Sequence, residues 1–324
     1  MASKMIGVEI GSSTLKMAVS VGGTIKTMAV KRMPEDLVRE GKITAPAAMV
    51  QFLTEMRKEN GIRPGPCALV LPSQVVIGHQ VTMPVMSESE LMLNLPFEFR
   101  DFVGKDGAKY DYDYSVMNVK DGVMELYAAA VRKSVVEEYY SVFKKAGLTL
   151  KIATPAEMAW LNLVRSKKNA PNKLCIVDMG HNITRVNIFS DGNFVMGQDI
   201  EMAGSLVDET IASTERIDPY VARTHKEANL NNVLTTEYCI DAYQTLVIEI
   251  MKILNFYVYS AQDGGALQDV YYCGGTAVIE PLRNTLLKGT GMTLHHLNRL
   301  VPMLEDDEDQ ALYCALAAGA AIQN

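Results

Sequence analysis

Hydrophobic and polar positions along the chain repeat at an offset of 169 residues. The offset lays Val8–Gly11 over Val177–Gly180, and seven apolar or glycine positions of the two copies keep one register. Each copy reads as a short apolar strand ending in an acid, a polar turn with glycine, an alternating strand, a tight turn and a third strand. The repeat therefore predicts two related α/β halves.

Amphipathic spacing predicts helices between these strands. One helix begins at Pro46, which is a favoured first residue of a helix. Ser134 and Glu137 have the spacing of a capping box for a second helix, and a third is expected from about Thr236 to Gln262. The apolar residues of all three helices are interpreted as core.

The pattern changes within residues 76–131. An extended segment leads to a helix with a capping box of Ser87 and Glu90, and two strand-like runs follow, Tyr112–Val119 and Met124–Val131. Strand, helix, strand, strand is a compact α+β unit that can fold as an insertion. The expected domains are a first half at 1–75 and 132–168, an inserted subdomain at 76–131, and a second half at 169–324.

Length and charge agree with this picture and exclude some functions. The 324 residues are about twice the usual domain length, and 48% of them are hydrophobic. The net charge of −7 argues against a protein that binds nucleic acid by neutralising phosphates. The longest apolar run, Leu312–Ile322, is too short to span a bilayer, and the start lacks a secretory signal, so we expect a cytoplasmic protein. Five scattered cysteines without a C-x-x-C pair indicate reduced, mostly buried thiols.

The polar turn after the first strand of each copy is rich in hydrogen-bond donors. Gly11, Ser12, Ser13 and Thr14 form the first turn, and Lys16 adds a cation. Backbone N–H groups and hydroxyls in such turns can surround a phosphate. The second turn offers Gly180, His181, Asn182 and Thr184. Taken singly, each turn is more often an ordinary polar β-turn, and neither matches a P-loop or a dinucleotide-binding fingerprint.

An acid ends the first strand of each copy, Glu9 in the first and Asp178 in the second. A buried carboxylate is costly unless it meets a cation or hydrogen-bond donors. Mg²⁺ held through water is the natural partner, because it keeps most of its waters and binds through one or two carboxylates and phosphate oxygens. A third element runs from a strand into Gly274, Gly275 and Thr276, where glycines let a flat ligand group approach the backbone.

These three elements, in this order, resemble the actin-like ATPase superfamily of actin, Hsp70 and sugar kinases. Within it the chain resembles the type IV pilus assembly protein PilM family from Ile6 to the C-terminus. The segments that carry the resemblance are Ile6–Lys16, Met33–Ile43, Leu95–Phe99 before Tyr112–Tyr114, Ile176–Gly180, Leu254–Tyr257 and Cys273–Ala277.

The resemblance implies an α/β protein with the actin-like ATPase fold, built from duplicated ribonuclease H-like halves. The insertion then corresponds to the SHS2-like subdomain (1C) that the family shares with the division protein FtsA, and it interrupts subdomain 1A. The second half corresponds to 2A with a reduced 2B. The implied cofactors are ATP or ADP with Mg²⁺, which Glu9 and Asp178 would hold through water as the catalytic acids. The implied nucleotide-binding residues are Gly11, Ser12, Ser13, Thr14, Lys16, Gly180, His181, Asn182, Thr184, Gly204, Gly274, Gly275 and Thr276.

The resemblance also implies a partner and a place in the cell. The partner is the cytoplasmic N-terminal peptide of a PilN-like protein, within the pilus assembly complex of the inner membrane. The chain would be peripheral there, held through a protein partner, and would bind no nucleic acid. A cleft beside the insertion, near Phe97 and Phe99, is the expected peptide site. The acidic run Glu305–Asp309 is interpreted as a solvated loop or a partner-facing patch.

Three residues depart from the family pattern. Glu9 stands where Asp is usual, His181 where a small residue is usual, and Thr276 where a third glycine is usual. A longer acid can move the metal and a bulky ring can crowd the terminal phosphate, so nucleotide binding with slow or absent hydrolysis is expected. His181 is equally well a hydrogen-bonded turn residue.

Three functional hypotheses remain at this point. The first is an ATP-binding adaptor, and the second is a kinase or ATPase of the same superfamily. A kinase needs a positioned general base, and the sequence offers none besides Glu9 and Asp178. The third is an FtsA-like filament protein, for which a C-terminal amphipathic membrane helix is expected after the last core helix. Self-association stays open.

Overall fold

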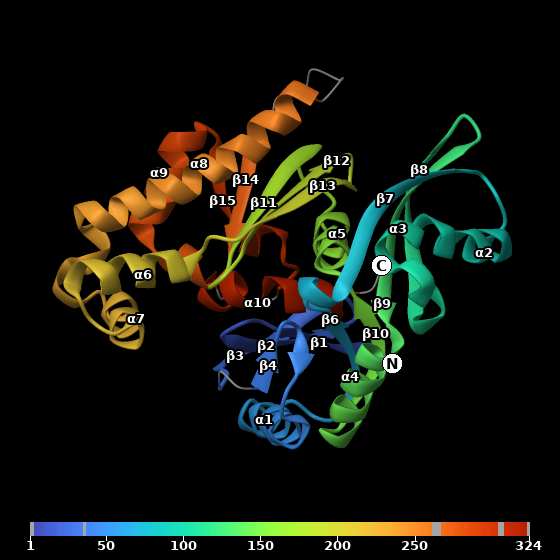
Figure 1. Cartoon of the computed structure of the whole chain (residues 1–324), viewed down its shortest axis with the longest axis horizontal. Helices are drawn as coiled ribbons and strands as arrows, with labels where there is room; N and C mark the ends of the chain where they lie inside the picture. Colours follow the sequence, from blue (N-terminus) through green and yellow to red (C-terminus); the bar gives the residue numbers. More distant parts are fainter. Residues whose placement is uncertain (1–2, 35–36, 261–266, 304–307, 323–324) are drawn as a thin grey trace. The chain divides into compact units, whose positions relative to one another are not determined.

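The computed structural model describes residues 3–34, 37–260, 267–303 and 308–322 (Figure 1). The chain divides into two compact units, which are described separately here. Unit 1 is Met1–Ser166 with Leu316–Asn324, and unit 2 is Lys167–Ala315. Residues 305–307 of the acidic run lie outside the described residues. Within the described ranges, no helix has both the length and the apolar character needed to cross a membrane.

Unit 1 is built on a five-stranded sheet in the order β10-β6-β1-β2-β3. The strands β1, β2 and β3 are antiparallel neighbours, and β6 and β10 continue the sheet in parallel with β1. The strand bounds are β1 (Lys4–Ile10), β2 (Thr14–Val21), β3 (Thr24–Arg32), β6 (Gly65–Val70) and β10 (Leu148–Thr154), with a separate small ribbon of β4 (Val38–Arg39) and β5 (Lys42–Ile43).

Helices α1 (Pro46–Glu59) and α4 (Lys133–Lys145) pack on this sheet through one apolar core. Helix α5 (Ala156–Ser166) and the last residues of α10 (Glu308–Ala321) also belong to unit 1. The predicted helix at Pro46 is confirmed. The predicted capping box at Ser134 is wrong, because β9 runs directly into α4 at Arg132 and Ser134 is already helical.

A three-stranded sheet in the order β7-β9-β8 follows within unit 1. Its strands are β7 (Val76–Pro84), β8 (Tyr110–Lys120) and β9 (Val123–Arg132). The 3₁₀ turn η2 (Ser73–Val75) leads into β7, and α2 (Glu88–Glu98), α3 (Arg100–Val103) and the 3₁₀ turn η3 (Gly104–Lys109) lie between β7 and β8. The helix and strands have a core of their own that includes Leu95 and Phe99. The predicted capping box is present, because Ser87 Oγ accepts from the Glu90 N–H and the Glu90 carboxylate accepts from the Ser87 N–H.

Unit 2 repeats the sheet of unit 1, in the order β13-β12-β11-β14-β15. The register repeats as well, because Val8 pairs with Met17 and Val177 pairs with Val186 at the predicted offset. The pairing of the second strand with the third shifts register at equivalent places in the two units: after Val19 in β2 and after Ile188 in β12. The predicted duplication of the hairpins is therefore confirmed. The strand bounds are β11 (Lys173–Met179), β12 (Thr184–Ser190), β13 (Asn193–Ile200), β14 (Asp269–Cys273) and β15 (Thr293–His296).

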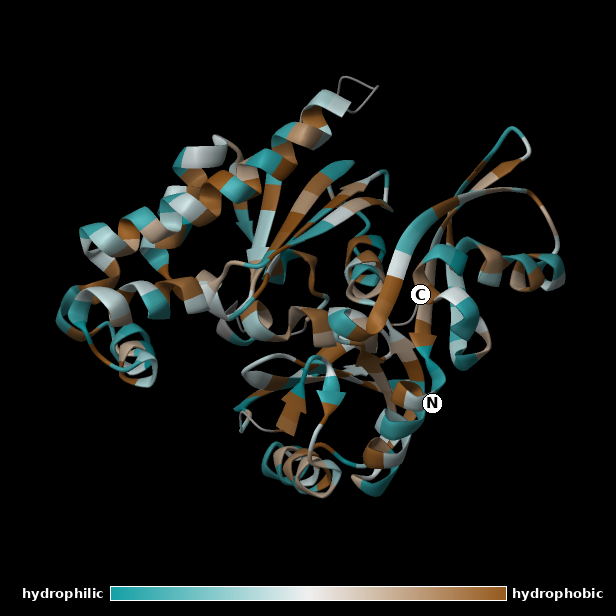
Figure 2. Cartoon of the chain, in the orientation of Figure 1, coloured by the Kyte–Doolittle hydropathy of each residue, from teal (hydrophilic) through white to brown (hydrophobic). Residues whose placement is uncertain are grey.

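The helices of unit 2 bury a second core against this sheet. Their bounds are α6 (Gly204–Glu215), α7 (Pro219–Glu227), α8 (Glu237–Ser260) and α9 (Glu280–Thr290), with 3₁₀ turns η4 (Leu230–Thr235), η5 (Gly275–Val278) and η6 (Leu297–Leu300). The long helix predicted from Thr236 is α8; Gln262 lies outside the described residues. Apolar and polar residues alternate along α8 in Figure 2, as expected for a helix with one buried face. All five cysteines, each within the described residues, are buried and none is in a disulfide, as predicted.

Candidate functional site

The loop between β1 and β2 places a cation beside an acid in unit 1. The Gly11 N–H donates to the Thr14 carbonyl at 3.0 Å and closes the loop, and Ser12 is exposed at its tip. Lys16 Nζ donates to Glu9 Oε1 at 2.6 Å, and both side chains are 13% exposed. A Cβ on Gly11 would lie 2.9 Å from Lys16 Nζ, so glycine leaves the space in which this cation sits.

The loop between β11 and β12 repeats this geometry in unit 2. The Gly180 N–H donates to the Ile183 carbonyl at 3.0 Å. This hydrogen bond is equivalent to that from Gly11 to Thr14, 169 residues earlier. His181 is half-buried and Asn182 is exposed at the tip. Thr184 is fully buried at the start of β12, so its hydroxyl is closed to solvent in this conformation.

The turn after β14 lies against the acid of the second loop. Gly274 has a left-handed φ of +92°, and a Cβ there would lie 2.6 Å from Asp178 Oδ1. The Thr276 hydroxyl donates to the Gly180 carbonyl. The Gly204 N–H also donates to that carbonyl, at 3.2 Å. Gly204 and Thr276 therefore meet at the Gly180 carbonyl, Gly274 lies against Asp178, and Gly275 is exposed.

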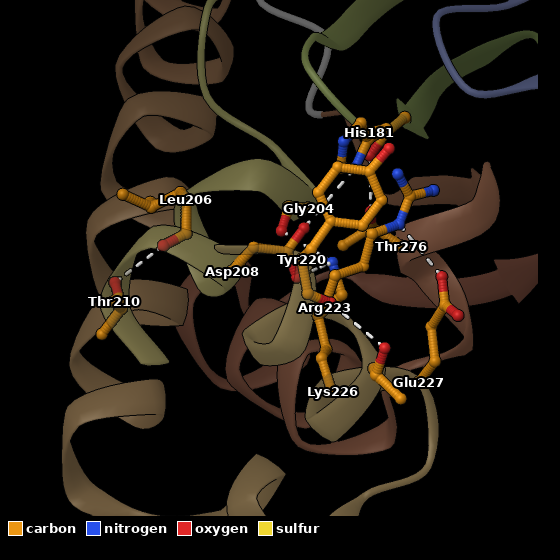
Figure 3. Close-up of polar contacts among 12 residues, drawn as sticks. His181, Gly204, Leu206, Asp208, Thr210, Tyr220, Arg223, Lys226, Glu227 and Thr276 are labelled. Carbon is orange, nitrogen blue, oxygen red and sulfur yellow. Dashed lines mark hydrogen bonds and ion pairs between the residues drawn. The ribbon is translucent and has the colours of Figure 1, made fainter. Parts of the chain in front are cut away.

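A buried ion pair lies next to this network, and the sequence analysis missed it (Figure 3). Lys226 Nζ on α7 lies 2.6 Å from Asp208 Oδ1 on α6 and donates to the Gly204 carbonyl at 2.8 Å. His181 Nδ1 lies 3.8 Å from Asp208 Oδ2. Burial raises the pKa of Asp208 and lowers the pKa of Lys226, in each case against the opposing effect of the partner's charge. The sequence does carry one sign of this pair: Asp208 lies four residues after Gly204, on the apolar face of α6, where a carboxylate needs a cation.

A second missed residue is Arg185, the repeat equivalent of Lys16. It pairs in register with Asp178 on β11 and with Asp199 on β13. Its Nη1 lies 3.6 Å from Asp178 Oδ2, and its Nε lies 3.4 Å from Asp199 Oδ1. The repeat itself was the signal for this residue, because it places a cation seven residues after the acid in both copies.

The carboxylates fit the chemistry of Mg²⁺, which takes one or two carboxylates and keeps its other ligands as water or phosphate. Asp178 is 8% exposed and lies against Gly274, whose missing Cβ leaves room beside its Oδ1. In the part of the chain that the structure describes, no three His, Cys, Asp or Glu side chains come together as a complete protein cage for a metal. Glu9 and Asp178 therefore suit a metal bound largely through water and ligand.

Unit 1 has a pocket of about 340 Å³ between β8 and α4. It is lined by Asp111, Lys133, Val136, Glu137 and Tyr140. Neither phenylalanine near the expected cleft is among the residues that line it: Phe99 is fully buried in the small core, and Phe97 is 58% exposed under the guanidinium of Arg100.

Comparison with solved structures gives the class of the molecule. MreB5 of Spiroplasma citri bound to ADP superposes with a TM-score of 0.54 at 14% identity, covering 98% of this chain and 94% of that one. The ethanolamine utilization protein EutJ of Carboxydothermus hydrogenoformans superposes with a TM-score of 0.63 at 14% identity, covering 100% and 91%. With two ribonuclease H-like sheets, the chain has the actin-like ATPase fold.

The family follows from the sequence match. The family model described as type IV pilus assembly protein PilM matches residues 7–313, so the chain belongs to the PilM family. A structure of the PilM–PilN type IV pilus biogenesis complex superposes with a TM-score of 0.85 at 20% identity, covering 99% of this chain and 98% of that one. No curated protein sequence gave a significant match. The family and fold expected from the sequence are thereby confirmed.

Proposed function

We propose that this PilM-family protein is a nucleotide-binding adaptor of type IV pilus assembly. The observation that carries the proposal is the pair of equivalent hairpins, each with a glycine-closed loop and an acid paired with a cation. Such loops offer N–H groups and positive charge to phosphates. In the same fold, MreB5 of Spiroplasma citri was solved with ADP and with AMPPNP.

The ligand in this proposal is ATP or ADP with Mg²⁺. Mg²⁺, when bound, would neutralise phosphate charge, and in each unit one acid, Glu9 in unit 1 or Asp178 in unit 2, is the candidate to hold its waters. In unit 1, the Gly11 loop and Lys16 would offer donors to a phosphate. In unit 2, the Gly180 loop would do the same beside the Gly274 turn, which would accept a flat part of the ligand. Lys226 joins the proposed set, because its ammonium lies 2.8 Å from the Gly204 carbonyl beside the second loop.

A thermal shift experiment tests nucleotide binding. A ligand at 100 times its Kd stabilises the folded state by about 2.7 kcal/mol, so millimolar Mg-ATP or Mg-ADP should raise the melting temperature. Asp178→Ala and Gly11→Val should abolish the shift, the first by removing a metal-water acceptor and the second by displacing the Lys16 ammonium, which lies 2.9 Å from an added Cβ. Asp241→Ala, on the exposed face of α8, is the matched control and should keep the shift. A wild-type protein without any shift would reject the proposal.

We further propose that the partner is the N-terminal cytoplasmic peptide of a PilN-like inner-membrane protein, which would keep the chain at that membrane. The PilM–PilN complex of the matched structure supports this partner. Within unit 1, the pocket between β8 and α4 has the apolar wall and charged rim of a modest peptide interface.

Two variants test the partner and its place. Replacement of residues 76–131 by a short linker should abolish peptide binding while Mg-ATP binding survives. Tyr140→Ala, which removes the aromatic ring of the pocket, should weaken peptide binding at least fivefold. The control Tyr259→Ala removes a tyrosine ring outside the pocket that is 88% exposed, against 47% for Tyr140, and should leave binding unchanged. Binding would be measured by fluorescence anisotropy of a labelled peptide. Retained binding in a folded linker variant would place the site elsewhere.

Hydrolysis in this proposal is slow or absent. A general base must accept a proton from the attacking water, and each acid that the sequence offers for this role lies beside a cation: Glu9 Oε1 is 2.6 Å from Lys16 Nζ, and Asp178 Oδ2 is 3.6 Å from Arg185 Nη1. His181 Nδ1 lies 3.8 Å from Asp208 Oδ2. We expect the pure protein to turn over less than about one ATP per second, below the usual enzymatic range. A faster rate in a phosphate-release assay would favour the ATPase or kinase hypothesis instead.

A further inference from the structure

Three segments of unit 1 meet at one end of its five-stranded sheet and bring a group of cations together. Lys4 Nζ, at the start of β1, donates to the carbonyl of Arg63 in the loop after α1, at 3.2 Å. Arg57, near the end of α1, donates through Nε to the carbonyl of Ala146, directly after α4, at 3.3 Å. These segments form one surface, called the basic end below. Its cations are Lys4, Arg57, Lys58, Arg63, Lys144 and Lys145.

The basic end is positive in a chain whose net charge is −7. Residues 3–7, 56–66 and 143–149 contain six cations and one acid, Glu59, and that acid already lies 2.8 Å from Lys31 of β3. Helices α1 and α4 both end here, and each helix C-terminus carries about half a negative charge. The two helix ends therefore account for only part of the positive charge, and a clear excess remains.

Most cations of the basic end are open to a partner. Lys58, Arg63, Lys144 and Lys145 are exposed, and none of them forms an ion pair with an acid in the part of the chain that the structure describes. None of the large apolar side chains that the described chain exposes lies in these three segments. Such a surface attracts an anionic partner by charge and offers it no apolar anchor.

The place of the basic end on α4 favours a lipid bilayer as the anionic partner. The pocket proposed for the peptide is lined by Val136, Glu137 and Tyr140 of this helix. Lys144 follows one turn later, with its Nζ 5.9 Å from the centre of the Tyr140 ring. In the proposed function the peptide belongs to a membrane protein, so the anionic headgroups of that membrane lie within reach of the basic end.

We propose that the basic end docks on the anionic headgroups of a lipid bilayer. The choice of a bilayer rests on the proposed peptide partner, whereas the positive surface does not. Each cation close to an anionic bilayer contributes about a fivefold gain in partitioning. The contact is electrostatic, so added salt weakens it. Peptide and headgroups then hold unit 1 together, each raising the local concentration of the other.

Flotation of the full chain with vesicles, without any peptide, tests this docking surface. At low salt the wild type should partition about tenfold more onto phosphatidylglycerol–phosphatidylethanolamine vesicles than onto phosphatidylcholine vesicles, and salt should release it. Lys58→Glu with Lys145→Glu reverses one cation from each helix and should lower the partitioning onto anionic vesicles about tenfold. The control Lys105→Glu with Lys120→Glu changes the net charge equally at exposed sites of the small subdomain and should stay within about twofold of wild type.

Three results would overturn the docking surface. These are equal losses in the two double variants, equal partitioning of wild type onto anionic and neutral vesicles, and tighter binding to a DNA duplex that the Lys58 and Lys145 reversals abolish. Neither Lys58 nor Lys145 lines the peptide pocket, so peptide anisotropy of that variant should match wild type. Absence of peptide binding in wild type would instead reject the proposed partner, and the vesicle result would still decide the docking surface.

Discussion

Gly274 is the residue on which the second loop depends most closely. Its φ of +92° lies in the left-handed region, and a Cβ at this position would meet the Met179 carbonyl and Asp178 Oδ1. Its N–H is also used, because it donates to the Leu312 carbonyl at 2.8 Å. Glycine is therefore required both for the backbone angle and for the approach to the acid.

Gly274→Ala should destabilise the protein by about 2–4 kcal/mol, because backbone strain adds to a clash with backbone that cannot yield. It should also abolish the stabilisation by Mg-ADP, since Asp178 must move. Gly291→Ala is the matched control: that glycine is exposed and also has a left-handed φ, +63°, but no described atom lies within 4 Å of an added Cβ, so it should cost the backbone strain alone and keep the stabilisation by Mg-ADP. Urea titrations with and without Mg-ADP measure both effects, and equal stability of the two variants would contradict this account.

Single positions also show where sequence reasoning stops. Glu9 and Asp178 could be predicted as site acids, because an acid at the end of an apolar strand repeats in both copies. The Lys226–Asp208 pair could not, since its partners lie on two helices and meet only through the packing of α6 on α7. Thr184 was predicted as a ligand from its turn, but the pairing of β12 places it inside the core.

The hairpins and helices were predicted best where one local pattern fixes them. The first three strands of each copy follow from alternation and tight turns, and the repeat supplied the register. Helix starts were less secure. Ser87 begins α2 after an extended segment and can cap it, whereas the same spacing at Ser134 falls inside α4 because β9 continues to Arg132.

This difference gives a matched pair of substitutions. Ser87→Ala should cost about 1 kcal/mol, because the Glu90 N–H loses its acceptor and Glu90 loses a donor. Ser134→Ala should change stability by less than about 0.5 kcal/mol, since Ser134 is exposed and caps nothing. Chemical denaturation of both variants checks the prediction. A cost at Ser134 equal to that at Ser87 would show that the second capping box forms in solution.

The contact between α6 and α7 should make stability depend on pH once its cation is removed. Burial raises the pKa of Asp208, so the folded state takes up a proton there more readily than the unfolded chain, and stability falls as the pH rises through that window. Lys226 opposes this shift by its charge and hydrogen bond. Lys226→Met should therefore cost about 3 kcal/mol at pH 8 and clearly less at pH 5.

The double variant Lys226→Met with Asp208→Asn is the control, because it removes both charges and should lose the pH dependence of the single variant. Urea titrations at the two pH values give the comparison. An equal loss at pH 5 and pH 8 for Lys226→Met would mean that Asp208 stays ionised without its partner, and would contradict the role given to burial.

Unit 1 is built from two segments that lie far apart in the sequence. Residues up to Ser166 form the sheet and the small subdomain, and the chain returns to this unit only at Leu316, within α10. Two glycines allow the return. A Cβ on Gly7 of β1 would overlap the Ala317 carbonyl, and one on Gly319 would overlap the Ala159 carbonyl of α5. Small residues on both sides therefore bring backbones together, and Asn162 Nδ2 donates to the Gly319 carbonyl at 3.1 Å.

Unit 1 should consequently depend on residues far along the chain. Truncation after Ala315 removes a set of buried apolar residues, and burial of the two largest contributes about 3–6 kcal/mol together. The removed buried residues are Leu316, Ala317, Ala318, Ala320, Ala321 and Ile322. Hydrogen exchange should then lose protection throughout residues 3–166, while the core strands of unit 2 keep theirs, because each unit has its own core.

Gly319→Val tests the same contact without shortening the chain. The added side chain would meet the Ala159 carbonyl and should release the end of α10 from α5. The control Gly61→Asn is at a left-handed position with no described atom within 4 Å of an added Cβ, and asparagine tolerates that angle, so it should leave exchange unchanged. Wild-type protection of β1 and β6 in both the truncated chain and Gly319→Val would mean that the first sheet is stable without its C-terminal segment.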